Sequence, residues 1–330
     1  MQTAQQNLRL QKIITFIGVV LFIMKIFAWY LTGSVAILTD ALESTVNVVA
    51  GLIGVYSLYV SAKPKDTDHP YGHGKAEFLS AAIEGTLMSV AGLIIMYEAI
   101  NNLVHPHPIQ KLDYGILIVA ATAVINYITG SICINTGKKN NSLVLIASGK
   151  HLQSDTYSTI GIIAGLILLY FVQLWWIDSA VAFIFAFIIT FTGYKIVRTS
   201  VAGIMDEADA TLLEKLVVTL NTNRKPNWID LHNLRIIKYG GTIHLDCHLT
   251  VPWYMNVHEA HHEIDVLSAL VKNKYGESME LFVHSDGCLE FSCRICTKDD
   301  CPVRQHPFEK QIEWTMANIV SNKKHGVNTL

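Results

Sequence analysis

Long runs of apolar residues fill the first two-thirds of the chain, whereas the remainder alternates apolar with polar positions. The apolar segments cover residues 13–31, 35–60, 78–104, 114–136, 145–171 and 175–197. Each is close to or longer than the ~20 residues that a helix needs to cross ~30 Å of hydrocarbon. The first segment is too long for a signal peptide and has no small-residue cleavage pattern after it. We predict an all-α bundle of six transmembrane helices, because a buried core explains one such segment but not six in succession.

The polar part of the chain predicts a mixture of helices and strands. Residues 211–221 have helical periodicity, and residues 257–275 form a longer amphipathic pattern. Residues 231–239 and 242–251 have the pattern of two strands joined at Gly240-Gly241, which is a strong hairpin signal. A short apolar strand is expected at 279–284. This order favours a small α+β domain in which one sheet carries helices on one face.

Composition and charge support a membrane location. Only 16% of the residues are charged and 51% are hydrophobic, whereas soluble domains average about 25% charged residues. This composition excludes a disordered chain or a coiled coil and predicts the lipid bilayer as the surroundings. The 25 basic residues do not exceed the 27 acidic ones, so we expect no nucleic-acid partner.

The distribution of lysine and arginine predicts the orientation. Among the segments that connect the predicted spans on one side of the membrane, the basic residue is Lys111 alone. The other side carries Arg9, Lys12, Lys63, Lys65, Lys75, Lys138, Lys139, Lys150, Lys195 and Arg198. Since basic loops stay in the cytoplasm, both termini and the polar domain are predicted to be cytoplasmic.

Ionisable residues inside two of the predicted spans indicate a site. Asp40, Glu43 and Asn47 follow one another at steps of three and four in the second span, and His151 and Asp155 are four residues apart in the fifth. Such residues are costly in a membrane and usually face a partner or a water-filled path. Carboxylates, an amide and an imidazole suit Zn²⁺ or Fe²⁺ better than Mg²⁺. Hydrogen bonding between helices is the alternative explanation.

The loop after the second span is rich in possible ligands. It contains Asp66, Asp68, His69 and His73 within eight residues. These side chains are equally compatible with a metal site and with a solvated loop that binds no metal.

Three motifs together resemble the cation diffusion facilitator family. They are the run from Phe27 to Leu38 around Gly33-Ser34, the His69-Pro-Tyr-Gly-His73-Gly-Lys75-Ala-Glu77 loop, and the His151-x-x-x-Asp155 pair. The similarity extends from the first span to about Asp286, and the bacterial zinc and iron exporters are the most similar members. It implies a homodimeric, six-span transporter of the inner membrane with a cytoplasmic ferredoxin-like domain. Such a transporter exports divalent metal in exchange for protons.

The resemblance also implies site residues. The transport site would comprise Glu43, Asn47, His151 and Asp155. The family usually has Asp or His at the first position and Asp at the second, so Glu43 and Asn47 are departures, and Asp40 is placed to supply the missing charge. The loop site would comprise Asp66, His69 and His73. Lys75 would pair with Asp206 to hold two protomers together.

The resemblance further implies a binuclear cytoplasmic site, bridged by Asp286. Its ligands would be His232, His248, His261, His284 and Asp286. The alternation of His284 and Asp286 on one strand agrees with this assignment. We expect the organisation to be a transmembrane efflux domain at 1–204, a dimerisation and metal-binding domain at 205–290 and an extension at 291–330.

The cysteines near the C-terminus are not explained by the resemblance. Cys288, Cys293, Cys296 and Cys301 have the spacing C-x4-C-x2-C-x4-C, and His306 follows Cys301 after four intervening residues. A cytoplasmic location disfavours disulfides, and the C-x2-C step is typical of structural zinc sites. The extension is therefore predicted to bind metal, with a metal-sensing tail or loosely held thiols as the alternatives.

The sequence favours a metal/proton antiporter, with Zn²⁺ as its main substrate and as a regulatory or structural ion. Export of Fe²⁺, Mn²⁺, Co²⁺ or Cd²⁺, and a membrane-anchored metal sensor without transport, are the alternatives. An intramembrane metal-dependent hydrolase would need a base such as Glu84 or Glu98. We do not expect an enzyme, because the sequence has no H-E-x-x-H pattern.

Overall fold

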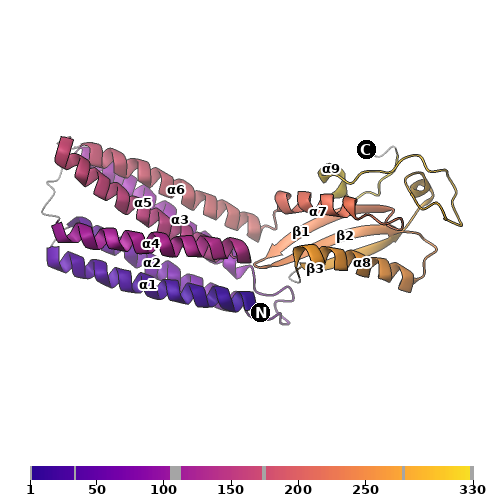
Figure 1. Ribbon diagram of the computed structural model, residues 1–330, viewed down its shortest axis with the longest axis horizontal. Helices are drawn as coiled ribbons and strands as arrows, with labels where there is room; N and C mark the ends of the chain where they lie inside the picture. The colour runs from indigo at the N-terminus through magenta and orange to yellow at the C-terminus, as the bar shows by residue number, and fades with distance from the viewer. Residues whose placement is uncertain (1, 33–34, 105–112, 173–175, 277–278, 328–330) are drawn as a thin grey trace. The chain divides into compact units, whose positions relative to one another are not determined.

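The structure is a computed structural model in which the chain divides into two compact units, residues 1–205 and 206–330 (Figure 1). It describes every residue except 1, 33–34, 105–112, 173–175, 277–278 and 328–330. The side chains of several further helical residues, among them 35–43 and 162–172, are also outside the description. Each unit is considered separately below.

Six long helices make up the described part of the first unit and coincide with the six predicted segments. They are α1 Gln2–Thr32, α2 Val35–Ser61, α3 Ala76–Val104, α4 Asp113–Asn140, α5 Leu143–Val172 and α6 Trp176–Ile204. Helix α3 packs along α6, and α4 packs along α5. Glycines permit these close approaches, because a Cβ on Gly85 would lie 2.8 Å from the carbonyl oxygen of Gly193. A Cβ on Gly130 would lie equally close to the carbonyl oxygen of Gly149.

Two stretches of the described residues are long and apolar enough to cross a membrane. They are Ala4–Phe27 in α1 and Ala76–Asn101 in α3. A core helix of a soluble protein can pass the same test, so these stretches alone are weak evidence for a membrane domain. The prediction that all six helices span the membrane stays a prediction.

The second unit is built around one mixed sheet. Its elements are α7 Ala210–Thr222, β1 Asp230–Tyr239, β2 Thr242–Val251, α8 Val257–Tyr275, β3 Met279–Gly287, the 3₁₀ turn η1 Glu290–Arg294 and α9 Met316–Ile319. Strand β1 pairs with β2 antiparallel, and β2 pairs with β3 in parallel. The described strands thus have the order β1-β2-β3. The predicted hairpin, helices and third strand are confirmed, whereas the ferredoxin-like assignment stays a prediction.

One face of this sheet carries the hydrophobic core. Alternate residues of β2, from Ile243 to Val251, pack with Leu216 of α7 and Leu267 of α8. Both helices therefore cover the same face, as the sequence predicted. Helix α8 is positioned by a capping box of Asn256 and Glu259.

A bulge in β1 changes which face its residues occupy. Asn233 has φ 53°, and the register with β2 shifts between His232 and Arg235. Such an extra residue reverses the alternation of the side chains. Leu234 can therefore point into the core although His232 does not share that face.

The C-terminal extension packs as part of the second unit. Trp314 is 1% exposed and belongs to the main core. Its backbone is held by Asn221, which donates to the Trp314 carbonyl at 2.6 Å and accepts from the Trp314 N–H at 3.1 Å. The guanidinium of Arg224 lies 4.0 Å from the Trp314 ring centroid and donates to the carbonyl of Ile312 at 2.6 Å. These contacts make the extension part of the packed domain.

We expect Trp314→Ala to lower the free energy of unfolding of the second unit by ~3–5 kcal/mol, because it leaves a large cavity in the core. Urea denaturation of the fragment 206–330, whose main core uses only its own residues, measures this loss. Phe308→Ala, at an exposed aromatic of the same extension, is the control and should change stability by about 0.5 kcal/mol or less. Equal effects of the two substitutions would contradict the role of Trp314.

Candidate metal centres

A small pocket between four helices contains three of the predicted transport ligands. It is lined by Asn47 from α2, Met88 and Ala91 from α3, His151, Ser154 and Asp155 from α5, and Ile189 from α6. The Nε2 atom of His151 lies 3.7 Å from Oδ1 of Asp155. The structure thus brings Asn47, His151 and Asp155 together. The side chains of Glu43 and Asp40 lie outside the described residues.

The amide of Asn47 bridges the other two polar groups. Its Nδ2 donates to Asp155, and its Oδ1 contacts Nε2 of His151. Because an amide oxygen can only accept, this contact requires a proton on Nε2 of the imidazole. Nδ1 of His151 is buried and has no hydrogen-bond partner among the described residues. An entering cation therefore has to replace the amide contact on Nε2 or use the uncommitted Nδ1.

Further buried ionisable groups lie among the helices of the first unit. Glu84 is 4% exposed and accepts a hydrogen bond from Ser148 at 3.2 Å. Ser148 in turn accepts from Gln11 at 3.2 Å. Lys25 is 2% exposed and donates to Ser44 at 2.9 Å. The sequence analysis gave Glu84 and Lys25 no part in the site, although an isolated charge within an apolar run was a visible signal.

The predicted loop site forms a cluster. One atom from each of Asp66, His69 and His73 lies within 4.8 Å of the others. Asp66 is 3.1 Å from Nδ1 of His69 and 3.4 Å from Nε2 of His73. The backbone N–H of His69 donates to Asp66 at 2.7 Å and is the largest contribution that lowers the pKa of this carboxyl. The carboxylate is thus ionised and available as a ligand.

Strand register aligns three histidines of the second unit. His248 of β2 is the partner of His232 on β1 and of His284 on β3. The ring centroids of His232 and His248 are 5.1 Å apart, and those of His248 and His284 are 4.6 Å apart. The histidines form a row across the sheet on the face opposite the hydrophobic core, because neighbouring strands keep paired residues on one face.

Asp286 lies beside this row. Its Oδ2 is 3.2 Å from Nδ1 of His248 and 3.6 Å from Nε2 of His232, and its Oδ1 is 3.7 Å from Nε2 of His284. Two ligands at 2.0–2.1 Å from a tetrahedral zinc ion are about 3.4 Å apart. The observed separations therefore fit a zinc ion held by His232, His248 and Asp286, with the second oxygen of Asp286 directed toward His284.

His261 is not part of this group. Its side chain is 68% exposed on α8, and its Nε2 lies 3.7 Å from Asp265 of the same helix. It therefore does not join His232, His248 and Asp286, the cytoplasmic cluster found among the described residues. The family resemblance implied His261 as a ligand, but within one chain the described fold does not bring it next to the other predicted ligands.

Residues of the C-terminal extension reach the cytoplasmic cluster, which the sequence analysis did not anticipate. Nζ of Lys324 lies 3.3 Å from Oδ1 of Asp286. His325 is buried and contacts Asp230 through its ring Nδ1 at 2.5 Å, and Asp230 lies 3.3 Å from Nδ1 of His232. A carboxylate behind a histidine ligand fixes the ring orientation. The position of Asp230, two residues before His232, was a signal in the sequence that it could lie near this site. No feature of the sequence indicated that Lys324 and His325 would do so.

The cysteines and Lys75 complete the set of predicted site residues. Cys288, Cys293, Cys296 and Cys301 line one pocket of the second unit. His306 is not among the lining residues and instead lies 3.2 Å from Glu290. Lys75 donates to the carbonyl of Ile204 at 3.4 Å. Its predicted partner Asp206 belongs to the other unit, so this pairing stays a prediction.

Comparison with protein families identifies both parts of the chain. Residues 12–205 match the cation efflux transmembrane domain. Residues 213–288 match the cytoplasmic domain of cation efflux proteins. The two matches correspond to the helical unit and the sheet unit, and the second ends at Cys288.

Individual relatives cover most of the chain. An uncharacterized transporter of Synechocystis sp. is 29% identical over 251 residues, which are 76% of this chain and 81% of the relative. The cation-efflux pump FieF of Shewanella oneidensis is 25% identical over 81% of this chain and 89% of its own length. An uncharacterized transporter of Methanocaldococcus jannaschii is 27% identical over 83% of this chain and 96% of its own length.

We expect Lys324→Ala to tighten zinc binding at the cytoplasmic cluster, because the substitution removes a cation that competes for Asp286. A partly exposed ion pair contributes ~0.2–1 kcal/mol, so the dissociation constant should fall by about 1.5- to 5-fold. Calorimetric titration of the metal-free fragment 206–330 measures the change. Lys323→Ala, at the adjacent exposed lysine, is the matched control, and an equal change there would contradict direct competition.

Proposed function

Because the chain belongs to the cation diffusion facilitator family of metal efflux transporters, we propose that it exports a divalent cation, chiefly Zn²⁺, from the cytoplasm in exchange for protons. The observation that carries this proposal is the convergence of Asn47, His151 and Asp155 on one pocket between helices. A polar site within apolar helices suits a cation that passes through the membrane. We place the protein in the inner membrane as a six-span homodimer with both termini in the cytoplasm.

Proton exchange follows from the chemistry of the ligands. An imidazole nitrogen and a carboxylate bind metal only when deprotonated, so metal binding releases protons and protonation releases the metal. His151 contributes a released proton only when both of its ring nitrogens carry protons before the metal binds, because a neutral imidazole keeps its single proton on the nitrogen that faces away from the metal. If the pocket opens alternately to the two sides of the membrane, a proton gradient drives the metal outward.

The donor set favours a borderline transition metal. Nitrogen and oxygen donors from a histidine, an amide and a carboxylate suit Zn²⁺ and Fe²⁺, whereas Mg²⁺ prefers oxygen ligands and retained waters. We propose Glu43 as the fourth ligand. Asn47 contributes a neutral oxygen, so the negative charge that offsets the ion comes from Asp155 and Glu43.

We assign the other two clusters to regulatory or structural ions. The loop cluster of Asp66, His69 and His73 is exposed enough to exchange metal with the cytoplasm. The cluster on the sheet lies in the domain whose family description is the cytoplasmic part of cation efflux proteins. His261 is exposed on α8, and we propose that it serves as a ligand toward a second copy of the chain.

We predict that His151→Ala and Asp155→Ala each abolish Zn²⁺ uptake into proteoliposomes under an imposed pH gradient, because each removes a ligand of the translocated ion. Gln153→Ala is the matched control. Gln153 lies on the same helix and donates to Ser131 at 3.0 Å, outside the lining of the pocket, so uptake should stay near the parental rate.

Parental uptake by either ligand variant would show that the transport site is elsewhere. Absence of uptake by the parent protein, with metal binding retained, would favour a membrane-anchored sensor. A panel of Zn²⁺, Fe²⁺, Mn²⁺, Co²⁺ and Cd²⁺ in the same assay identifies the preferred metal.

We also predict that the apparent affinity for transported Zn²⁺ weakens as pH falls from about 8 to about 6. An ordinary imidazole titrates near pH ~6.5, so protons compete with the metal in this range. The measurement is the KM of uptake at each pH without a gradient, together with a pH-sensitive dye inside the vesicles. A flat KM and no proton movement would contradict antiport without contradicting metal transport.

A further inference from the structure

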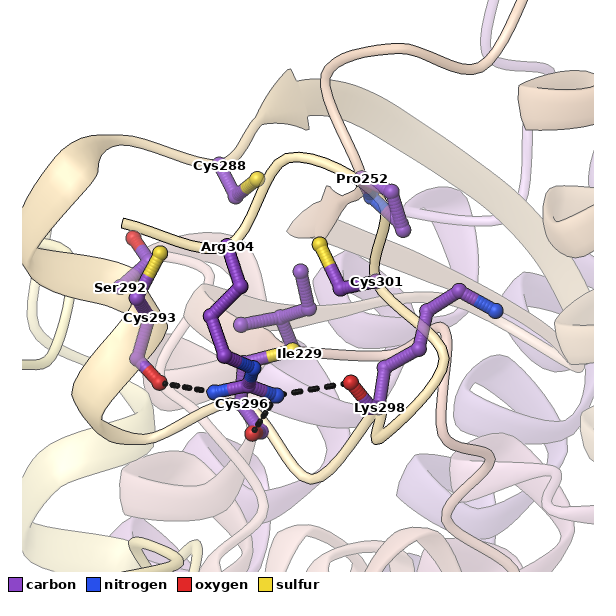
Figure 2. Close-up of a pocket in the computed structure, with 9 residues that line it drawn as sticks. All are labelled: Ile229, Pro252, Cys288, Ser292, Cys293, Cys296, Lys298, Cys301 and Arg304. Carbon is purple, nitrogen blue, oxygen red and sulfur yellow. Dashed lines mark hydrogen bonds between the residues drawn. The ribbon is translucent and has the colours of Figure 1, made fainter. Parts of the chain in front are cut away.

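Four cysteines meet at one pocket in the second unit, outside both His-and-Asp clusters (Figure 2). Cys288 follows β3, Cys293 belongs to η1, and Cys296 and Cys301 follow in the next loop. Each of the four side chains lines the pocket, together with Ile229 and Pro252. Since the cytoplasmic family match ends at residue 288, Cys293, Cys296 and Cys301 belong to the extension of this chain.

An arginine holds the loop that carries these cysteines. The guanidinium of Arg304 donates to the backbone carbonyls of Cys293 at 3.0 Å, Cys296 at 3.1 Å and Lys298 at 2.7 Å (Figure 2). The guanidinium of Arg304 thus links the backbone of the C-x2-C pair to the backbone of Lys298 in the loop that follows. This arrangement preorganises the backbone of the loop and places a positive charge next to the thiols.

Backbone donors and burial act on two of the sulfurs. The backbone of Trp253 acts to lower the pKa of the Cys288 thiol, and that of Lys298 acts to lower the pKa of the Cys296 thiol. Burial nevertheless raises the pKa of both thiols above the ordinary cysteine value. A metal bound to cysteine ligands replaces the protons of their thiols.

We propose that Cys288, Cys293, Cys296 and Cys301 bind one Zn²⁺ ion in a tetrahedral site that fastens the C-terminal extension to the sheet domain. The C-x2-C step and four thiolate ligands are those of a closed structural zinc site. Lys298 and Arg304 offset part of the negative charge of a zinc tetrathiolate. Ile295 and Cys296 also pack with Ile229 and Ile312, so the ion would reinforce an existing contact between the extension and Ile229, the residue directly before β1.

Ligation requires the cysteine side chains to rotate toward one another. Sulfurs around one zinc ion lie about 3.8 Å apart, given Zn–S bonds of ~2.3 Å. The cysteines are not among the groups of described residues that have three ligand atoms within 4.8 Å of one another. Rotation of a cysteine between staggered positions moves its sulfur by about 3 Å, and we propose that such rotations bring the four sulfurs of this pocket to one ion.

The alternatives are distinguishable by chemistry. Disulfides are disfavoured in the cytoplasm. The spacing of Cys288, Cys293 and Cys296 also occurs in plant-type iron–sulfur proteins, in which the fourth cysteine is not so close to the others in sequence. Cys301 follows after only four residues, which favours a single ion over a cluster.

The test uses the full-length protein, purified with reductant and stripped of metal. Titration with Co²⁺ should give thiolate-to-cobalt charge-transfer absorption that saturates at one ion per chain and disappears on addition of Zn²⁺. The histidine and carboxylate clusters do not contribute to this band, so the result does not depend on transport. The Cys293→Ser/Cys296→Ser double variant should lose the band. Cys247→Ala is the control because Cys247 is buried in the sheet core, and it should retain the band.

A second variant keeps the test valid if the double variant unfolds. Cys301→His preserves four ligands of a kind that zinc accepts, so it should retain a tetrahedral cobalt spectrum at about three-quarters of the parental intensity, whereas Cys301→Ser should bind more weakly. Lack of the band in the reduced parent protein, or its persistence in the double variant, would overturn the proposal. Iron with acid-labile sulfide in the protein as isolated would overturn the assignment to zinc.

Discussion

The need to pair ionisable groups in an apolar environment is the constraint on which both units depend. A charged side chain inside a helix bundle is costly unless it has partners. In the first unit, Asn47 provides partners to both His151 and Asp155, and hydroxyls provide them to Glu84 and Lys25. The same pairing that stabilises the metal-free bundle therefore prepares ligands for a cation.

This constraint also explains why Asn47 is compatible with a transport site. An amide both donates and accepts, so it satisfies an imidazole N–H and a carboxylate at the same time. A second carboxylate at this position would repel Asp155 when no metal is bound. A neutral amide at position 47 thus lowers the negative charge that attracts the ion, and it also lowers the electrostatic repulsion within the metal-free site. Both effects suit a site that must release the transported ion.

In the second unit, the extension has a structural role next to the metal cluster. Trp314 and Ile312 anchor it in apolar packing, and Lys324 and His325 extend this contact to Asp286 and Asp230. The cysteine pocket lies at the start of the same segment, directly after β3. The extension therefore follows β3 directly at its start and contacts Asp286 and Asp230 again near its end.

The periodic and local features of this protein were determined by the sequence itself. Apolar runs predicted the positions of the six long helices, and Gly240-Gly241 with alternating residues predicted the hairpin, because length, periodicity and turn chemistry act over a few residues. The i, i+4 spacing placed His151 and Asp155 on one helical face for the same reason. Tertiary structure alone decided which distant groups meet. The bulge at Asn233 separates His232 from the core face, strand register aligns His232, His248 and His284, and the return of the extension brings Lys324 to Asp286. These contacts join residues far apart in the chain, and no local pattern encodes them, because they arise only when whole elements pack together.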